Sequence, residues 1–286
     1  MLSAFKHFWS VIVVVIALLW GGDALCAPSL TPERIVSLAP DATEILYAIG
    51  LGNRIVGVSS ACDHPAAVRA KPKVGNMPNP SLEAILALKP DVVVVSVKGN
   101  PKSIADRLIK LGKKVYIFDA TRLTELPASI RRMGQALGAK EAAEKAAQKI
   151  DAAIAKASVR RKKLRRGEIK ALFVVWPKPL IVAGDNTIIN DAMNINGLKN
   201  IAAGTGIAYP HFSIEAVIER RPDLIIIGAA HDPDMKQESK ELIEHLRMLD
   251  AVRKGQVCYV GDALYRAGLR IGEGLAELQQ CGAMVK

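Results

Sequence analysis

Hydrophobic residues along the chain follow two alternating patterns, which predict strands and helices in turn. Short runs of aliphatic residues, such as Val92–Ser96 and Leu224–Ile227, are typical of strands that are buried on both faces. Between these runs, apolar residues recur every three or four positions, as they do on one face of a helix. This alternation favours an α/β fold with mostly parallel sheets. We expect strands at 34–38, 55–59, 92–96, 115–119, 169–175, 224–227 and 257–260, and helices at 40–50, 82–88, 103–111, 187–194, 213–219, 238–248 and 270–281.

One segment in the middle of the chain predicts a single long helix. Residues 139–166 contain neither proline nor glycine, and they consist mainly of strong helix formers. A helix of this length spans about 40 Å. We therefore expect two α/β lobes, at 27–137 and 168–286, joined by a bridging helix at 138–167.

The helix expected after the first strand carries two acidic residues near its start. Asp41 and Glu44 have the three-residue spacing of a capping box, and Pro40 precedes them. This spacing predicts that the two carboxylates stabilise the first turn of the helix.

An internal repeat supports the two-lobe organisation. Residues 81–95 align without gaps on residues 213–227, and the serine, glutamate, alanine, proline and aspartate of the two segments are identical. The distance between the segments is too long for a solenoid repeat. Two lobes of similar structure explain the repeat better than chance does.

The N-terminus predicts a secretory signal peptide at residues 1–26. Lys6 precedes an apolar run at 8–20, and small residues follow it. The run is too short for a typical membrane-spanning helix. We expect export, with cleavage after Cys26; whether the segment is cleaved or retained as an anchor stays open.

The charge of the chain does not point to a nucleic-acid partner. The formal net charge is +11, and part of the excess lies in one run, residues 160–166. Basic chains often bind nucleic acid, but this sequence has no recognition motif and is expected to be exported. We interpret the run as a solvated helix end; attraction to an anionic membrane surface remains an alternative.

The sequence contains no recognisable catalytic motif. We therefore expect no catalytic residue, no resident metal ion and no cofactor. The alternative class is an exported metal-binding protein or enzyme in which His64 and His211 converge with Asp63 and Asp262. We favour exposed loop positions for the two histidines.

Three cysteines follow the expected signal peptide, so at most one disulfide can form between them. Cys62, Cys258 and Cys281 lack the spacing of a metal site. We favour small buried hydrophobic roles for all three, and a disulfide stays open.

Four blocks of sequence resemble the solute receptors of the cobalamin and ferric-siderophore ABC importers, and among these the cobalamin receptors are the most similar. The blocks are residues 35–65, 72–95, 182–201 and 209–227. The resemblance implies two α/β lobes bridged by one rigid helix. It also implies a periplasmic protein that captures cobalamin or a related bulky metal chelate and delivers it to the permease dimer of an ABC importer. A ferric siderophore or haem is the alternative ligand.

The same resemblance implies a set of ligand-binding residues. Met77 and Tyr209 stand where the cobalamin receptors have tryptophans, and Ala61, Ser96 and Ile181 stand where rings are usual. Asn196 stands in place of one cysteine of the family disulfide, whose other cysteine matches Cys281. The expected ligand-binding residues are Met77, Trp176, Tyr209, Asp262, Tyr265 and Arg266.

Glu83 and Glu215 are the paired acids of the internal repeat. Each lies in the first turn of an expected helix, where an acidic side chain also stabilises the helix dipole. The resemblance implies that they dock the receptor onto the permease dimer.

Overall fold

The computed structural model describes residues 31–164, 168–228 and 233–285, and residues 31–286 form one unit. The predicted signal peptide lies outside the described residues. Among the helices that are described, none has the length and apolar character needed to cross a membrane.

The first lobe is built on a four-stranded parallel sheet with the strand order β2-β1-β3-β4. Its strands are β1 (Ile35–Ser37), β2 (Ile55–Val58), β3 (Val92–Ser96) and β4 (Val115–Phe118). Its α-helices are α2 (Pro40–Ala48), α3 (Leu82–Ala87), α4 (Lys102–Lys110) and α5 (Leu126–Ala136), with short 3-10 helices at Gly52–Arg54 and Ala66–Ala70.

The second lobe is built on a sheet with the order β6-β5-β8-β9, in which β7 also pairs with β5. Only β6 runs antiparallel among the pairs described. The strands are β5 (Ile169–Pro177), β6 (Leu180–Val182), β7 (Leu198–Asn200), β8 (Leu224–Ile227) and β9 (Val257–Tyr259). The helices are α7 (Ile188–Ile195), α8 (Ile214–Arg220), α9 (Pro233–His245), α10 (Asp250–Arg253) and α11 (Ile271–Ala283).

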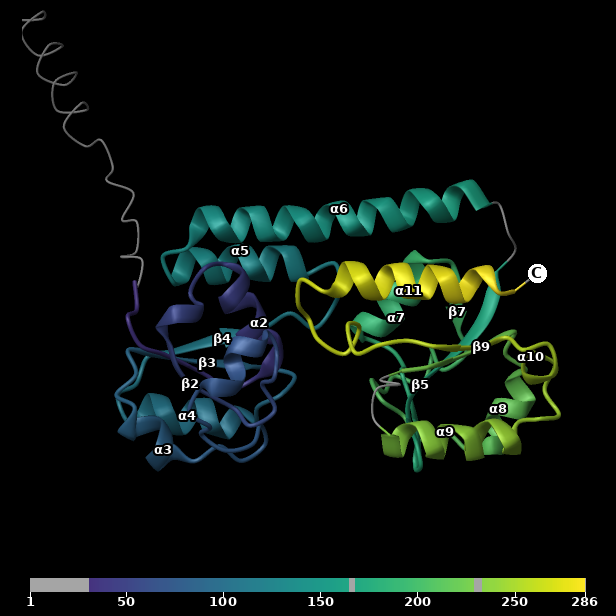
Figure 1. Ribbon diagram of the computed structural model, residues 1–286, viewed down its shortest axis with the longest axis horizontal. Helices are drawn as coiled ribbons and strands as arrows, with labels where there is room; N and C mark the ends of the chain where they lie inside the picture. The colour runs from purple at the N-terminus through teal and green to yellow at the C-terminus, as the bar shows by residue number, and fades with distance from the viewer. Residues whose placement is uncertain (1–30, 165–167, 229–232, 286) are drawn as a thin grey trace, which may run out of the picture. The chain divides into compact units, whose positions relative to one another are not determined.

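A long helix, α6 (Lys140–Leu164), connects the two sheets along the chain. It runs over α5 of the first lobe and beside α11 of the second (Figure 1). The predicted fold class, two α/β lobes with one bridging helix, is confirmed. The helix falls within the predicted range of 138–167, while the exact lobe boundaries stay predictions.

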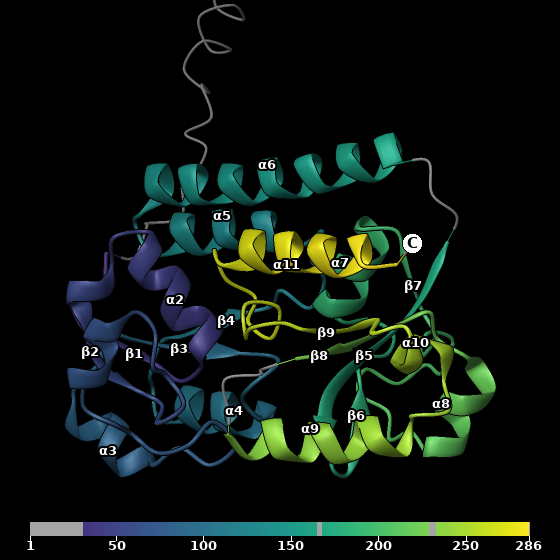
Figure 2. The same cartoon turned by 45° about the vertical axis from the view of Figure 1, so that its right-hand side comes forward.

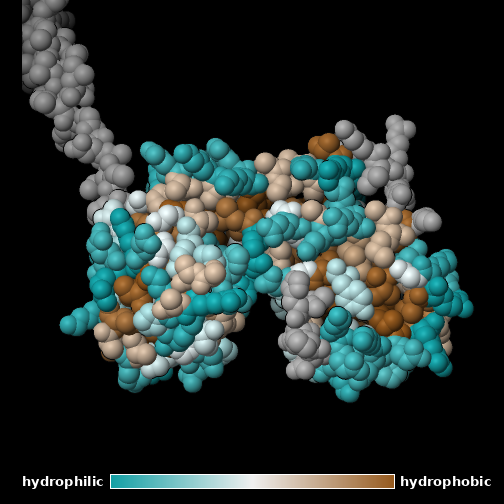
Figure 3. Space-filling model, in the orientation of Figure 1, coloured by the Kyte–Doolittle hydropathy of each residue, from teal (hydrophilic) through white to brown (hydrophobic). Residues whose placement is uncertain are grey.

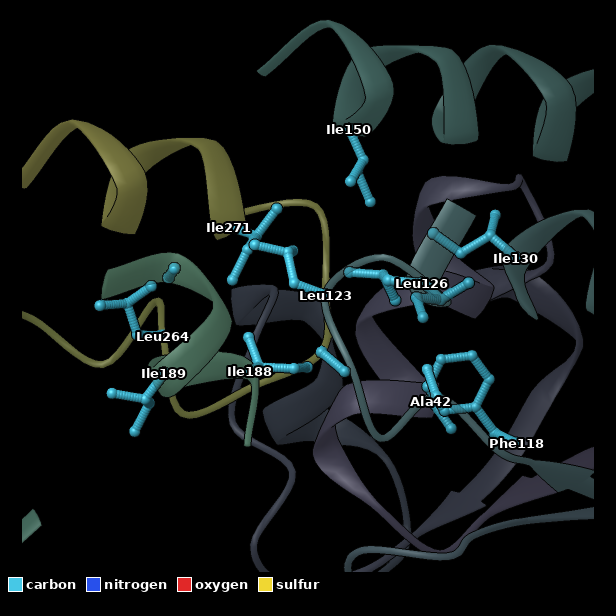
Figure 4. Packing of buried hydrophobic residues seen from close by; sticks show 14 of the residues in the cluster. Ala42, Phe118, Leu123, Leu126, Ile130, Ile150, Ile188, Ile189, Leu264 and Ile271 are labelled. Carbon is cyan, nitrogen blue, oxygen red and sulfur yellow. The ribbon is translucent and has the colours of Figure 1, made fainter. Parts of the chain in front are cut away.

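One hydrophobic cluster is shared by both lobes. It joins residues of α2 and α5, such as Ala42 and Ile130, to residues of α7 and α11, such as Ile188 and Ile271 (Figure 4). Ile150 of α6 belongs to the same cluster. The opposite face of each sheet packs against separate clusters that include residues of α3 and α4 in one lobe and α8 and α9 in the other. Because the shared cluster is continuous, the lobes are packed together and not merely tethered.

The internal repeat corresponds to the same local structure in both lobes. The side chains of Ser81 and Ser213 cap α3 and α8 by accepting hydrogen bonds from the backbone N–H groups of Ala84 and Ala216, at 3.1 and 3.2 Å. Lys89 and Arg221 also have the same left-handed φ of 45° before the proline that precedes the next strand. The repeat therefore encodes a helix, a turn and a strand twice.

The cysteines correct one prediction. Cys258 of β9 and Cys281 of α11 form a disulfide, and Cys62 is a buried free thiol. The hydrophobic interpretation was wrong for the first two, because the fold places α11 against β9. Asn196, which stands in place of a family cysteine, instead donates a hydrogen bond to the carbonyl of Ala192.

The basic run begins in the last turns of α6. Arg160 and Arg161 are exposed, as expected for a solvated helix end. Arg160 also donates to Gln279 of α11, and Arg161 donates to the carbonyl of Asn194 in the last turn of α7. A cation at the C-terminal end of a helix is favourable for the helix dipole, so these two residues help attach α6 to the second lobe.

Candidate functional site

A cavity of about 270 Å³ lies between the two lobes, next to the carboxyl ends of β1 and β3. The described unit is hollowed between the lobes on the side away from α6 (Figure 3). In α/β proteins, ligands bind beyond the carboxyl ends of parallel strands. The residues that line the cavity are Pro40, Asp41, Ala61, Met77, Lys98, Gly99, Tyr265 and Arg266.

Tyr265 provides a rigid aromatic wall from the second lobe. Its hydroxyl donates to the carbonyl of Val175 at 3.2 Å, and its ring meets Phe173 edge-on. A Cβ atom at Gly228 would lie 2.1 Å from the Tyr265 hydroxyl, so only glycine leaves room for the ring there. Burial raises the pKa of Tyr265, which keeps the phenol neutral.

Met77 provides the apolar wall of the first lobe. The side-chain amide of Asn100 donates to the carbonyls of Met77 and Leu38, at 2.9 and 3.1 Å. These bonds hold the Met77 loop against the ends of β1 and β3. A Cβ atom at Gly99 would lie 3.0 Å from the Met77 sulfur, so the side chain packs closely on the backbone.

Asp41 and Lys98 give the cavity its titratable groups in the first lobe. Asp41 accepts hydrogen bonds from the Ser96 hydroxyl at 2.7 Å and from the backbone N–H of Ala42 at 2.8 Å. Burial raises the pKa of Asp41 in spite of these bonds. Desolvation lowers the pKa of Lys98, and the nearby carboxylates, Asp41 foremost, oppose that shift.

A network of ion pairs crosses between the lobes beside the cavity. Glu44 of α2 accepts from Arg266 at 2.9 Å and from Arg270 at 3.1 Å. Arg266 also donates to Asp63 at 2.6 Å, and Arg270 donates to Asp262 at 2.7 Å. These contacts lower the pKa values of the Asp63 and Asp262 carboxyls. Because Glu44 is almost fully buried, the network fixes the two lobes against each other.

The same network corrects the predicted capping box. The N-cap of α2 is Ala39, which has no side chain to cap with, and Asp41 and Glu44 are both buried. Asp41 points to the cavity, and Glu44 points to the second lobe. Asp41 and Glu44 do lie near the start of α2, but they do not cap it. The side-chain partner of Asp41 is a serine and those of Glu44 are arginines, all far away in the sequence.

The predicted ligand-binding residues are only partly brought together. Met77, Tyr265 and Arg266 line the cavity, and Asp262 lies 3.6 Å from Arg266. Trp176 and Tyr209 do not line this cavity, and the two residues are 39% and 44% exposed.

Trp176 and Tyr209 nevertheless belong to the same side of the second lobe. Trp176 lies at the end of β5, where its indole N–H donates to the carbonyl of Lys178. Tyr209 is close enough to Tyr265 to influence the pKa of that phenol. The two exposed rings therefore offer apolar surface outside the cavity itself.

Glu83 and Glu215 occupy equivalent positions in the two lobes. Both are exposed in the first turn of their helices, α3 and α8. Backbone N–H groups at the helix start, followed by the capping serines, lower the pKa of both carboxyls. In both views α3 and α8 lie on the side of the described unit opposite α6 (Figures 1 and 2).

Among the residues that the structure describes, His64 and His211 do not form an assembled site with Asp63 and Asp262. Asp63 and Asp262 are engaged by arginines, and His211 forms an isolated β-bridge with Ile181. Within the described ranges, no group of three or more His, Cys, Asp or Glu side chains is arranged to hold a metal ion.

Sequence reasoning missed Lys98 and Arg270 as site residues. Lys98 lies two residues after the buried strand β3, and a polar residue at that edge of the sheet is a usable signal. Arg270 gave no such signal, because only the folded chain brings it to Glu44.

Comparison with known proteins decides the family. A family model described as periplasmic binding protein matches residues 35–264, which is most of the chain. The chain belongs to the periplasmic binding protein family. The vitamin B12-binding protein of Pectobacterium atrosepticum is 31% identical over 215 residues, covering 74% of this chain and 77% of that protein.

Solved structures agree with this assignment to the periplasmic binding protein family. The vitamin B12 binding protein BtuF of Vibrio cholerae has a TM-score of 0.77 and 27% identity, covering 90% of this chain and 98% of that one. The haem-binding protein RhuT of Roseiflexus sp. RS-1 has a TM-score of 0.78 and 28% identity, covering 89% and 99%. The family and these neighbours are binding proteins.

Proposed function

We propose that this protein is the extracytoplasmic substrate-binding component of an ABC importer. It captures cobalamin or a related bulky metal chelate in the periplasm and delivers it to the permease dimer. It acts as a binder and not as an enzyme, and residues 1–26 direct its export. The observation that carries the proposal is the cavity between the lobes, where Met77 and Tyr265 face a common space.

The chemistry of the cavity suits a flat, largely apolar ligand with polar edges. Met77 and Tyr265 offer apolar contact from opposite lobes, while Lys98 supplies positive charge at the edge of the cavity beside the ion-paired Arg266. A volume of about 270 Å³ is at the low end for small-molecule pockets. The cavity therefore takes one edge of a macrocycle, and the exposed rings of Trp176 and Tyr209 provide surface for the rest.

Haem is the second candidate ligand, with ferric siderophores as the further alternative. Residues where cobalamin receptors carry rings are here Ala61 and Ser96, and Ser96 is bonded to Asp41. Haem-binding proteins also share the fold at 25% identity or above, such as RhuT and a haem-binding protein of Pseudomonas aeruginosa. A possible iron-binding protein of Staphylococcus epidermidis shares the fold at 26% identity, which keeps a ferric siderophore among the candidates.

Absorption spectroscopy tests the proposed function directly. We expect the purified mature protein to bind cyanocobalamin with a saturable change in the visible spectrum at one equivalent. Parallel titrations with haemin and ferrichrome identify the alternatives, because each chelate has its own absorption bands. Saturation by haemin alone would assign the second candidate, and no saturable change with any of the three would contradict the proposal.

Tyr209→Ala should weaken ligand binding by about 1–3 kcal/mol, because a stacked ring contributes that much to a large flat ligand. The side chain is exposed, so its loss should leave the thermal midpoint nearly unchanged. Isothermal calorimetry and a melting curve measure the two quantities. Tyr209→Phe, which keeps the ring, is the matched control. Unchanged affinity with a lowered melting temperature would instead assign Tyr209 a packing role.

A further inference from the structure

Lys98 occupies a defined place in the cavity wall. It follows β3 by two residues, and its backbone N–H donates to the hydroxyl of Ser96. Its side chain lies beside Met77 and Gly99 in the lining. Among the described residues, its ammonium group makes no hydrogen bond or ion pair, although Asp41, Asp191 and Glu125 act on it electrostatically.

The other cation that lines the cavity already has its charge compensated by carboxylates that contact it. Arg266 is paired directly with Glu44 and Asp63, at 2.9 and 2.6 Å. The carboxyl in the cavity wall, Asp41, is committed to Ser96 and is buried, so its ionised form is disfavoured. Lys98 is therefore the cation of this cavity that lacks a contacting anion.

Resting on the proposed function, we propose that Lys98 selects ligands that carry an oxyanion at the edge of the macrocycle. An ammonium that lacks a contacting anion favours a negative oxygen over a neutral amide oxygen, because the attraction between opposite unit charges adds to the hydrogen bond. The oxyanion is a carboxylate in haem and a phosphodiester in the nucleotide loop of cobalamin. In either case the ring face lies on Met77 and Tyr265 while the anion lies on Lys98.

Two pairs of ligands isolate this contact. Cyanocobalamin carries the phosphodiester, and dicyanocobinamide lacks the nucleotide loop; haemin carries free carboxylates, and its dimethyl ester does not. Dissociation constants are measured by absorption or fluorescence for the wild type, Lys98→Met, Lys98→Arg and Lys114→Met. Lys114 is an exposed lysine that precedes β4, at the sheet edge away from the cavity.

Lys98→Met should raise the dissociation constant of the oxyanion-bearing member of the bound pair by roughly 10- to 100-fold, the range for a hydrogen bond to a charged group. It should leave the neutral member unchanged, Lys98→Arg should restore most of the affinity, and Lys114→Met should have no effect. The pair that shows this pattern identifies the source of the oxyanion.

Equal effects on both members of each pair, or no effect on either, would overturn the role of Lys98 while leaving the proposed function in place. If the wild type binds ferrichrome but none of the four ligands, this inference fails and the proposed function stands. If it binds neither ferrichrome nor any of the four, both fail.

Discussion

A protein carrying both Glu83→Arg and Glu215→Arg is expected to bind its ligand normally but to lose transport and complex formation with the permease. The two carboxylates are exposed at equivalent positions of the repeated helix-turn-strand unit, one in each lobe. A permease dimer presents two copies of any basic patch about its two-fold axis. Reversing both charges places like charges at both contacts, and such contacts govern docking rate and register.

The experiment compares ligand affinity, permease pull-down and uptake into proteoliposomes that hold the cognate importer. Asp106→Arg with Glu273→Arg is the matched control, because it reverses one exposed acid on α4 and one on α11 and leaves the first turns of α3 and α8 unchanged. If the two residues act only on the helix dipole, the double variant should lose a little stability and keep normal uptake. Near-normal uptake by the Glu83 and Glu215 double variant would therefore contradict the docking role and leave both residues with a helix-stabilising role only.

Most strands and helices were predictable because their signals are local, whereas the three-residue strands β6 and β7 were not predicted. The strand Val92–Ser96 was predicted with its observed bounds, because a run of consecutive valines is typical of a buried strand. The repeat was equally informative, because Ser81 and Ser213 cap their helices through bonds that span only three residues. The helix α5 was not predicted as a separate element. Residues on both sides of Gly138 have a helical composition, and the turn there, where φ is 75°, separates α5 from α6.

The site was less predictable because its contacts join distant parts of the chain. Glu44 meets Arg266 across 222 residues, and no local spacing distinguishes that partner from a helix dipole. Cys258 and Cys281 likewise pair only because α11 packs against β9. By contrast, Met77, Tyr265 and Arg266 were predicted from resemblance and do line one cavity. Resemblance thus indicated residues that share one cavity, and the folded chain was needed to show which charges lack a contacting partner.

Glu44→Ala is expected to lower the free energy of unfolding by about 3–5 kcal/mol, because it breaks a buried ion pair and leaves two guanidinium groups short of an acceptor. The Glu44 side chain is only 5% exposed, and it joins α2 to both Arg266 and Arg270 of the second lobe. Urea unfolding at neutral pH measures the change. Glu44→Gln should cost less, because the amide oxygen still accepts a hydrogen bond.

Glu144→Ala provides the matched control for Glu44→Ala. Glu144 pairs with Arg131 at 2.7 Å, but its side chain is 45% exposed and both partners belong to the helices α5 and α6. Water screens an exposed ion pair, so such a pair contributes little to stability, and the control should unfold close to the wild type. If Glu44→Ala lost no more stability than Glu144→Ala, the ion pairs between the lobes would be incidental. The shared hydrophobic cluster alone would then hold the lobes together.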